Sequence, residues 1–401
     1  MISDTEFQIR YALGMRLAIL ALAAAFSATA QNDSLLNYSI TGSSDSTSPT
    51  ENATYAMQHP EVQRLLLAVA ASPRDRDYVE AALRGSGVSL DDMISNGSLR
   101  LEDGRFWLNF GLLTRGDQEI ILRAANTYSQ RLADGVLKRR AEIEALLKGY
   151  GLDRKAAAFI VLGCFSLDWD GLNYATAKGY RAKSPQRKSG SFFVMAEERG
   201  GVPLKQIYWG SSNSAYGKFG FTTFGDHFSP RNSTLWALRR QGPAEWRNKP
   251  ISEFAQKVGP LMFALRQGPR AADGDGLLEA MAEIGWARKE GALYRAAIPV
   301  LTEQDRAMVT GLLRIGRKAL EEWFGANYED LKSALADISP VRNRVPFPVA
   351  FDQIWHYLFG IANEKLVEAG LFADPYAPEA AFQGYMPAVY VQGMGWLPER
   401  L

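Results

Sequence analysis

The chain contains the same succession of elements twice, and this duplication limits its fold more than any other feature. A helix, an alternating ribbon with a glycine at its tip and a long amphipathic helix occur over residues 85–181 and again over 273–373. Leu113-Thr114 and Asp117 are matched by Leu301-Thr302 and Asp305, and matched positions along the two copies lie about 187 to 191 residues apart. Such an ordered match predicts two copies of one supersecondary unit.

Each copy has clear local signals. In the first, Ser89 precedes a short apolar helix as a typical N-cap, and Asp103-Gly104 between two alternating runs predicts a tight β-hairpin. Residues 117–147 and 305–335 have apolar side chains at helical spacing, which predicts two long helices. We expect these helices either to pack on each other about a pseudo-twofold axis or to pair between two chains of a homodimer.

Length and composition fit a folded protein of several domains. With 401 residues, 47% hydrophobic and 22% charged, the chain should form two to three globular domains, mainly α with small β. The expected segments are a signal peptide or upstream extension (1–30), a Ser/Thr-rich linker (31–56), the first repeat (57–182), a Gly/aromatic β-rich insertion (183–245), the second repeat (246–376) and a C-terminal tail (377–401).

Charge and cysteine content exclude several classes of protein. The net charge is +1, so any polyanion must be held by local patches and not by a global basic field. A single cysteine, Cys164, excludes an intrachain disulfide framework, and with three histidines it leaves no Cys/His zinc site of usual spacing. We therefore expect no metal and no cofactor.

The N-terminal segment leaves the location of the protein open. Met15-Arg16, the apolar run 17–26 and the small residues up to Ala30 have the order of a secretory signal peptide. Cleavage there would place the protein in the periplasm or outside the cell. Asp4 and Glu6 are unusual ahead of such a run, and a true start near Met57 would make the protein cytoplasmic.

Three helices followed by a two-stranded ribbon with a polar tip is the order of a winged helix-turn-helix. On these elements the chain resembles tandem winged-helix proteins of the ArsR-like regulator type, clearly over residues 60–110 and less clearly over 251–298. The expected fold is thus two winged-helix repeats, each a helical triplet, a β-wing and a long helix, with a β-rich insertion between them. The resemblance implies a recognition helix in the major groove and a wing on the DNA backbone.

Carried over by position, the resemblance implies a set of binding residues. The recognition helix offers Ser89, Ser95 and Asn96, and the two wings offer Arg100 and Arg105, then Arg288, Lys289 and Arg295. The sequence departs from the usual chemistry because acidic residues occupy both recognition helices, namely Asp91, Asp92, Glu279 and Glu283. Phosphate would repel these carboxylates, so packing against a protein partner remains an equal alternative.

Two further groups of residues are candidates. A basic run that includes Lys183, Arg187 and Lys188 enters the insertion and offers phosphate contacts if it is not simply a solvated linker. Asp226 and His227 lie in a Gly-rich stretch, where a histidine beside an acid is suited to general-base chemistry. No catalytic signature motif accompanies them, so a loop histidine is the simpler interpretation.

The leading hypothesis is a tandem winged-helix protein of the transcription-regulator type, which recognises DNA or a protein partner without catalysis. The alternative is an exported ligand-binding protein or hydrolase with its site around Asp226 and His227.

Overall fold

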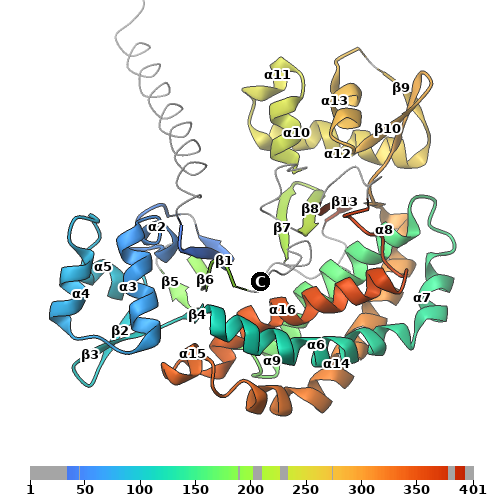
Figure 1. Cartoon of the computed structure of the whole chain (residues 1–401). Coiled ribbons are helices and arrows are strands. Elements are labelled where there is room, and N and C mark those ends of the chain that lie inside the picture. Colours follow the sequence, from blue (N-terminus) through green and yellow to red (C-terminus); the bar gives the residue numbers. More distant parts are fainter. Residues whose placement is uncertain are drawn as a thin grey trace, which may run out of the picture. The chain divides into compact units, whose positions relative to one another are not determined.

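The computed structural model describes residues 34–44, 46–187, 190–201, 210–225, 234–272, 274–377 and 384–392 (Figure 1). Over these residues the protein is mainly α-helical with small β-sheets, as the composition and periodicity indicated. The chain divides into two compact units. Unit 1 comprises Met1–Gln118, Ser184–Gly201 and Ile338–Pro346, and unit 2 comprises the remainder.

Unit 1 contains a three-helix segment followed by a hairpin. The elements are α3 (Pro60–Ala71), α4 (Arg76–Leu83), α5 (Leu90–Ser95), β2 (Leu99–Glu102) and β3 (Arg105–Leu108). At the hairpin tip Asp103 and Gly104 both have positive φ, 52° and 72°, as a two-residue turn between strands requires. Arg74, between α3 and α4, pairs with Phe106 of β3 and adds a third, one-residue strand position.

A small sheet completes unit 1. Its strands are β1 (Leu36–Ser44), β4 (Gly111–Leu113), β5 (Gln186–Arg187) and β6 (Gly190–Glu198). The central strand β6 pairs antiparallel with β1 and parallel with β4. Residues 36–44 were expected to lie in a linker without core residues. They form a strand because β6, more than 140 residues later, supplies its hydrogen-bonding partner and Leu36 is fully buried.

Unit 2 contains the corresponding segment of the second half. Its elements are α10 (Leu235–Gln241), α11 (Ala244–Arg247), α12 (Ile251–Gln267), β9 (Arg270–Ala271), α13 (Leu277–Glu283), β10 (Ala287–Glu290) and β11 (Leu293–Ala296). The hairpin β10–β11 carries β9 as a third strand on β11. Trp286 and Tyr294 are buried in the core beneath this hairpin.

The sheet of unit 2 repeats the pairing of the first sheet. Its strands are β7 (Ser211–Tyr216), β8 (Phe219–Gly225), β12 (Val300–Leu301) and β13 (Tyr385–Val391). The central strand β13 pairs antiparallel with β8 and parallel with β12. Both halves therefore follow the same pattern. A strand before the helical segment (β1 or β8) and a short strand after the hairpin (β4 or β12) both pair with one strand that comes later in the chain (β6 or β13). The insertion thus contributes strands to two different sheets, and the C-terminal segment supplies a central strand.

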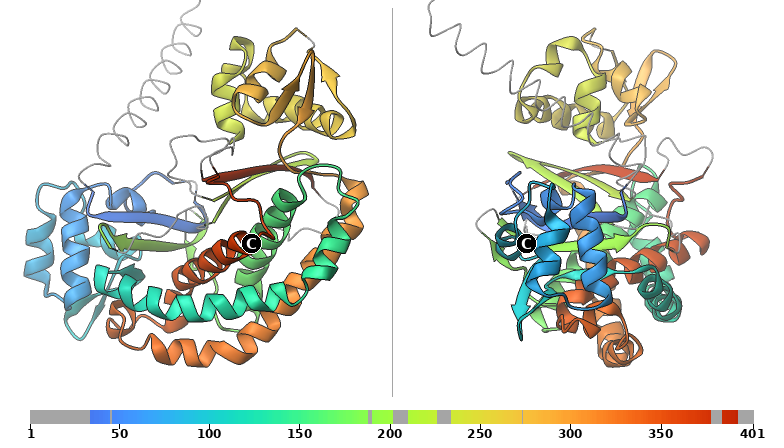
Figure 2. Two further views of the ribbon diagram at one scale, coloured as in Figure 1. Left: turned by 45° about the vertical axis from the view of Figure 1, so that its right-hand side comes forward. Right: turned by 60° about the vertical axis from the view of Figure 1, so that its left-hand side comes forward.

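Long helices follow the short strands. They are α6 (Arg115–Leu137), α7 (Arg140–Leu147) and, after a 3₁₀ turn η3 (Glu303–Asp305), α14 (Arg306–Ala334). α6 and the η3–α14 segment begin with the same arrangement, in which the threonine N–H and hydroxyl donate to an aspartate three residues later, Thr114 to Asp117 and Thr302 to Asp305. Within unit 2, α6 and α7 run antiparallel to α14: Trp323 Nε1 donates to Tyr128 O at 2.8 Å, and further along Gly135 lies beside Ala319 and Leu146 beside Gly311 (Figure 2).

Closing helices end each half. The remaining elements are α2 (Ala53–Ala56), α8 (Arg154–Ala158), the π-helix η1 (Phe159–Asp170), α9 (Gly171–Ala177), α15 (Ser339–Arg342) and α16 (Phe347–Glu368). In unit 2, η1 and α16 pack closely, and Trp355 Nε1 donates to Leu167 O at 3.0 Å. In the described part of the chain, no helix combines the length and the apolar character needed to cross a membrane.

Candidate functional site

The first candidate binding helix, α5, uses most of its polar side chains within the fold. Ser89 is its N-cap: the Ser89 hydroxyl accepts from Asp92 N–H, and Asp92 Oδ2 accepts from Ser89 N–H. Asn96 is fully buried, where its amide donates to Pro49 O at 2.7 Å and accepts from Ser98 N–H at 2.9 Å. Ser95 and Asp91 are exposed. Asp92 therefore belongs to a cap, and Asp91 carries the acidic character of this surface.

The hairpin β2–β3, which we call wing 1, is covered by residues 338–346 of the same unit. Arg100 does not point to solvent as a free cation, because its Nη2 donates to Asn343 O at 2.7 Å and it also pairs with Glu102. Arg344 Nη1 lies 2.8 Å from Glu102 Oε1, and its guanidinium stacks 4.6 Å from the Trp107 ring centroid. Arg100 and Glu102 of wing 1 are thus engaged in contacts within unit 1.

Arg105 is the exception on wing 1. It is exposed, and Nη1 makes one long hydrogen bond of 3.4 Å to Pro73 O. One exposed arginine beside the carboxylates of Glu102 and Asp103 gives this hairpin little positive potential.

The hairpin β10–β11, which we call wing 2, is exposed and basic. Arg288 and Arg295 lie directly opposite each other on the two strands, and both contact Glu290, at 2.7 Å each. Lys289 is exposed above the ring of Tyr294. One carboxylate thus faces two arginines on one face of the hairpin, Lys289 lies on the other face, and the hairpin keeps an excess of positive charge.

The described residues of the basic run between the halves differ in exposure. Lys183 is exposed, whereas Arg187 donates to Asn96 O at 2.5 Å and stacks on Phe192, and partial burial lowers its pKa. Lys188 lies outside the described residues, as do Asp226 and His227 of the alternative enzymatic site. The structure therefore offers no geometry for a general base at His227.

A buried polar cluster in unit 2 was not predicted from the sequence. Arg181 Nε and Asp352 Oδ1 lie 2.5 Å apart, and both side chains are almost fully buried. Asp168, near the end of η1, accepts a hydrogen bond from the Ser211 hydroxyl at 3.2 Å. On α16, the Nδ1 atom of His356 lies 2.7 Å from the backbone oxygen of Asp352.

Burial controls protonation in this cluster. It raises the pKa of Asp168 to about 8, with a further increase from the charge of Asp352, so this carboxyl keeps its proton at neutral pH. Burial lowers the pKa of His356, which keeps its ring neutral. Across the described residues no three His, Cys, Asp or Glu side chains gather as a metal site would need. The signal in the sequence was Asp352 and His356, four residues apart in the apolar run 347–362.

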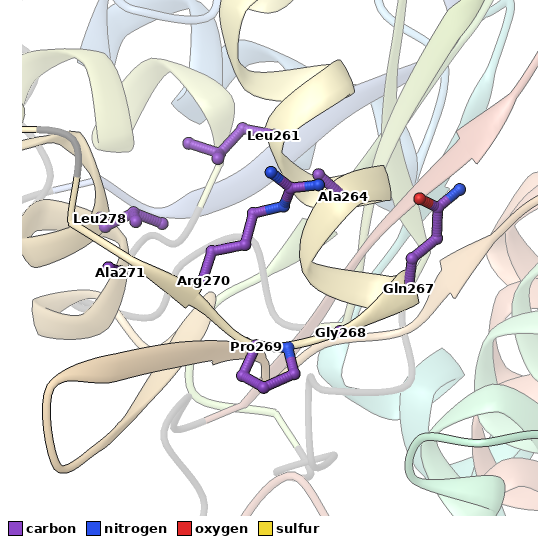
Figure 3. Close-up of a pocket in the computed structure, with 8 residues that line it drawn as sticks. All are labelled: Leu261, Ala264, Gln267, Gly268, Pro269, Arg270, Ala271 and Leu278. Atoms are coloured by element: carbon purple, nitrogen blue, oxygen red, sulfur yellow. The ribbon is translucent and has the colours of Figure 1, made fainter.

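A shallow hollow lies beside wing 2 (Figure 3). It measures about 500 Å³ and lies between the C-terminal end of α12, β9 and the start of α13. Its lining is part apolar and part polar, and comprises Leu261, Ala264, Gln267, Gly268, Pro269, Arg270, Ala271 and Leu278. Arg270 is exposed and adds a fourth cation near the sheet of wing 2.

The described geometry thus presents an open basic surface on wing 2 and an enclosed polar cluster in unit 2. Comparison with known proteins adds no further constraint: no protein-family model matches the chain, and neither the curated proteins nor the solved structures contain a significant match.

Proposed function

We propose that the protein is a tandem winged-helix protein of the transcription-regulator type that binds duplex DNA through its second repeat. The support is topological. Each half has a helix, then a short strand position paired with the second hairpin strand, and then a helix that leads into a two-stranded hairpin. In the first half α4 and α5 both lie between that position and the hairpin, and in the second half α13 lies there. This is the order of elements in a winged helix, in which the hairpin contacts the DNA backbone.

The observation that carries the proposal is the cross-strand pair of Arg288 and Arg295 on wing 2. Two guanidinium groups directly opposite each other repel, and the single carboxylate of Glu290 offsets only part of that repulsion. A phosphate backbone supplies the missing negative charge, and guanidinium groups bind phosphate with two parallel hydrogen bonds.

Wing 1 has a different role in this proposal. The Arg100 side chain donates to the backbone oxygen of Asn343. Arg344 donates to the carboxylates of Glu102 and Asp103. We assign wing 1 to internal packing, so a single winged-helix module contacts DNA. With a net charge of +1, binding should be modest and strongly dependent on salt.

The test is the binding of a short fluorescein-labelled duplex of mixed sequence, followed by anisotropy from about 50 to 200 mM salt. Arg288→Gln with Arg295→Gln should weaken binding and reduce the slope of log affinity against log salt by about two. The matched control is Arg64→Gln with Arg76→Gln, which removes the same charge from two exposed arginines of the first repeat.

Equal losses from the wing 2 variant and the control would show only a general charge effect and would reject wing 2 as the DNA contact. A wild-type protein that does not bind the duplex at low salt would reject the DNA proposal and favour a protein partner.

A further inference from the structure

We infer that α10 and α11 form a second phosphate contact, on the opposite side of α13 from wing 2. This inference rests on the proposed DNA-binding function and specifies how the duplex is held. The partner is duplex DNA whose two strands are contacted separately, one by wing 2 and the other by the α10–α11 pair.

The placement of α10 supplies the first argument. In unit 1, α4 lies in sequence between α3 and α5 and packs on both of them. In unit 2, the described residues between α12 and α13 contain no helix, and it is α10, from before α12, that packs on both. The position that α4 fills in the first repeat is thus filled in the second by a helix from elsewhere in the chain. In a helix-turn-helix this position crosses the DNA backbone.

The flanks of α13 supply the second argument. α13 contacts α10 on one side and β10 of wing 2 on the other, and Figures 1 and 2 both show α13 between them. α13 itself exposes Glu279 and Glu283 and so repels phosphate. If α13 enters a groove of the duplex, the protein surfaces on both sides of α13 would therefore hold the DNA, because the two phosphate backbones border the groove.

Charge supplies the third argument. Residues 235–250 carry four cations, Arg239, Arg240, Arg247 and Lys249, against one carboxylate, Glu245. Arg240, Arg247 and Lys249 are exposed. Arg239 has a local task, since its Nη1 donates to Lys249 O at 2.6 Å and ties the end of α10 to the residues after α11. Arg247 also has a local contact, since its Nε donates to Gly242 O at 3.1 Å. The flank is thus a fixed basic surface that exposes Arg240 and Lys249 in addition.

The aromatic residues of this surface favour duplex DNA over single strands. Single-strand binding commonly uses an open aromatic ring on which a base stacks. Trp236 is 44% exposed, but the Arg239 guanidinium lies over its ring at 4.8 Å, and Lys249 lies over the ring of Trp246 at 4.6 Å. Because cations cover these aromatic faces, the surface offers a ligand positive charge and no open ring for base stacking at Trp236 and Trp246.

The experiment compares three double variants of the full chain on the same labelled duplex. They are Arg240→Gln with Lys249→Gln, the wing 2 variant Arg288→Gln with Arg295→Gln, and the control Arg64→Gln with Arg76→Gln. We expect each of the first two to reduce the salt slope by about two, and their combination by about four, while the control leaves it unchanged. Circular dichroism melting of each variant verifies that the fold is retained.

If the wing 2 variant reduces the slope and the α10–α11 variant does not, the inference is overturned and the proposed function stands. If the wild-type protein binds no duplex, or binds only single-stranded DNA of the same length, both are overturned. Losses that do not add in the combined variant would place the two surfaces on the same phosphates and would also overturn the two-strand arrangement.

Discussion

The two wings have the same strand pairing and opposite surroundings. In both, four-residue strands pair in register around a tip that contains a glycine at positive φ. Residues 338–346 cover wing 1 through Arg344 and the backbone of Asn343. Wing 2 keeps its arginines exposed and paired only with Glu290, as far as the described residues show. The hairpin is therefore a local structure whose use is decided by what packs on it.

Two buried acids on the closing helices η1 and α16 also differ in their surroundings. At the end of η1, Asp168 is a buried carboxyl that retains its proton, because burial raises its pKa to about 8. On α16, Asp352 is a buried carboxylate that forms an ion pair with Arg181. The burial of the two acids is thus offset differently, by a bound proton at Asp168 and by the Arg181 guanidinium at Asp352, so their asparagine variants should behave differently.

The largest effect is expected from Asp352→Asn. The change leaves the Arg181 guanidinium buried without its counter-charge, which should lower the free energy of unfolding by about 3–5 kcal/mol. Urea denaturation followed by tryptophan fluorescence measures it. The control is Asp170→Asn, whose partner Arg317 is partly exposed, with an expected loss of about 1 kcal/mol or less. A loss for Asp352→Asn no larger than the control would contradict a tight ion pair.

Asp168→Asn should act in the opposite direction and depend on pH. The folded state holds a proton up to about pH 8, whereas the unfolded chain releases it near 3.8. Folding therefore binds a proton in this window, and wild-type stability falls by up to ~1.4 kcal/mol per pH unit as the pH rises towards 8, then levels off. The amide has no proton to lose, so the variant should gain on the wild type from pH 5 to 8.

Unfolding free energies at pH 5, 6, 7 and 8 test this, with Asp91→Asn as the exposed control. A difference between Asp168→Asn and wild type that stays constant with pH would show that Asp168 is ionised in the folded protein.

The smallest effects test the cover of wing 1. Asn343 is buried and its amide donates to Ala70 O and Ser339 O, both at 2.9 Å, so Asn343→Ala should cost about 1–3 kcal/mol. Arg344→Gln removes an exposed ion pair and should cost about 1 kcal/mol or less. Hydrogen exchange of β2 and β3 reports both changes. Faster exchange in Arg344→Gln than in Asn343→Ala would reverse the order and make the ion pair the main contact.

Local features of the fold were predictable because neighbouring residues encode them. Asp103-Gly104 specifies a tight turn, and the threonine and aspartate pairs at 114 and 117 and at 302 and 305, which had been matched between the two copies, form the same hydrogen bonds at the start of the long helices. Both hairpins and the start of each long helix depend on contacts within a few residues. The winged-helix assignment and the DNA role, which rest on how such elements are used, remain proposals.

The tertiary structure decided the strands and the surroundings of the charged residues. Residues 36–44 carry little strand signal, and they form β1 because β6 pairs with them across the chain. Arg181 and Arg187 belong to one basic run in the sequence, yet one is buried with Asp352 and the other supports Asn96. Sequence patterns report local conformation, whereas the burial and pairing of a polar group depend on partners that folding brings from distant positions.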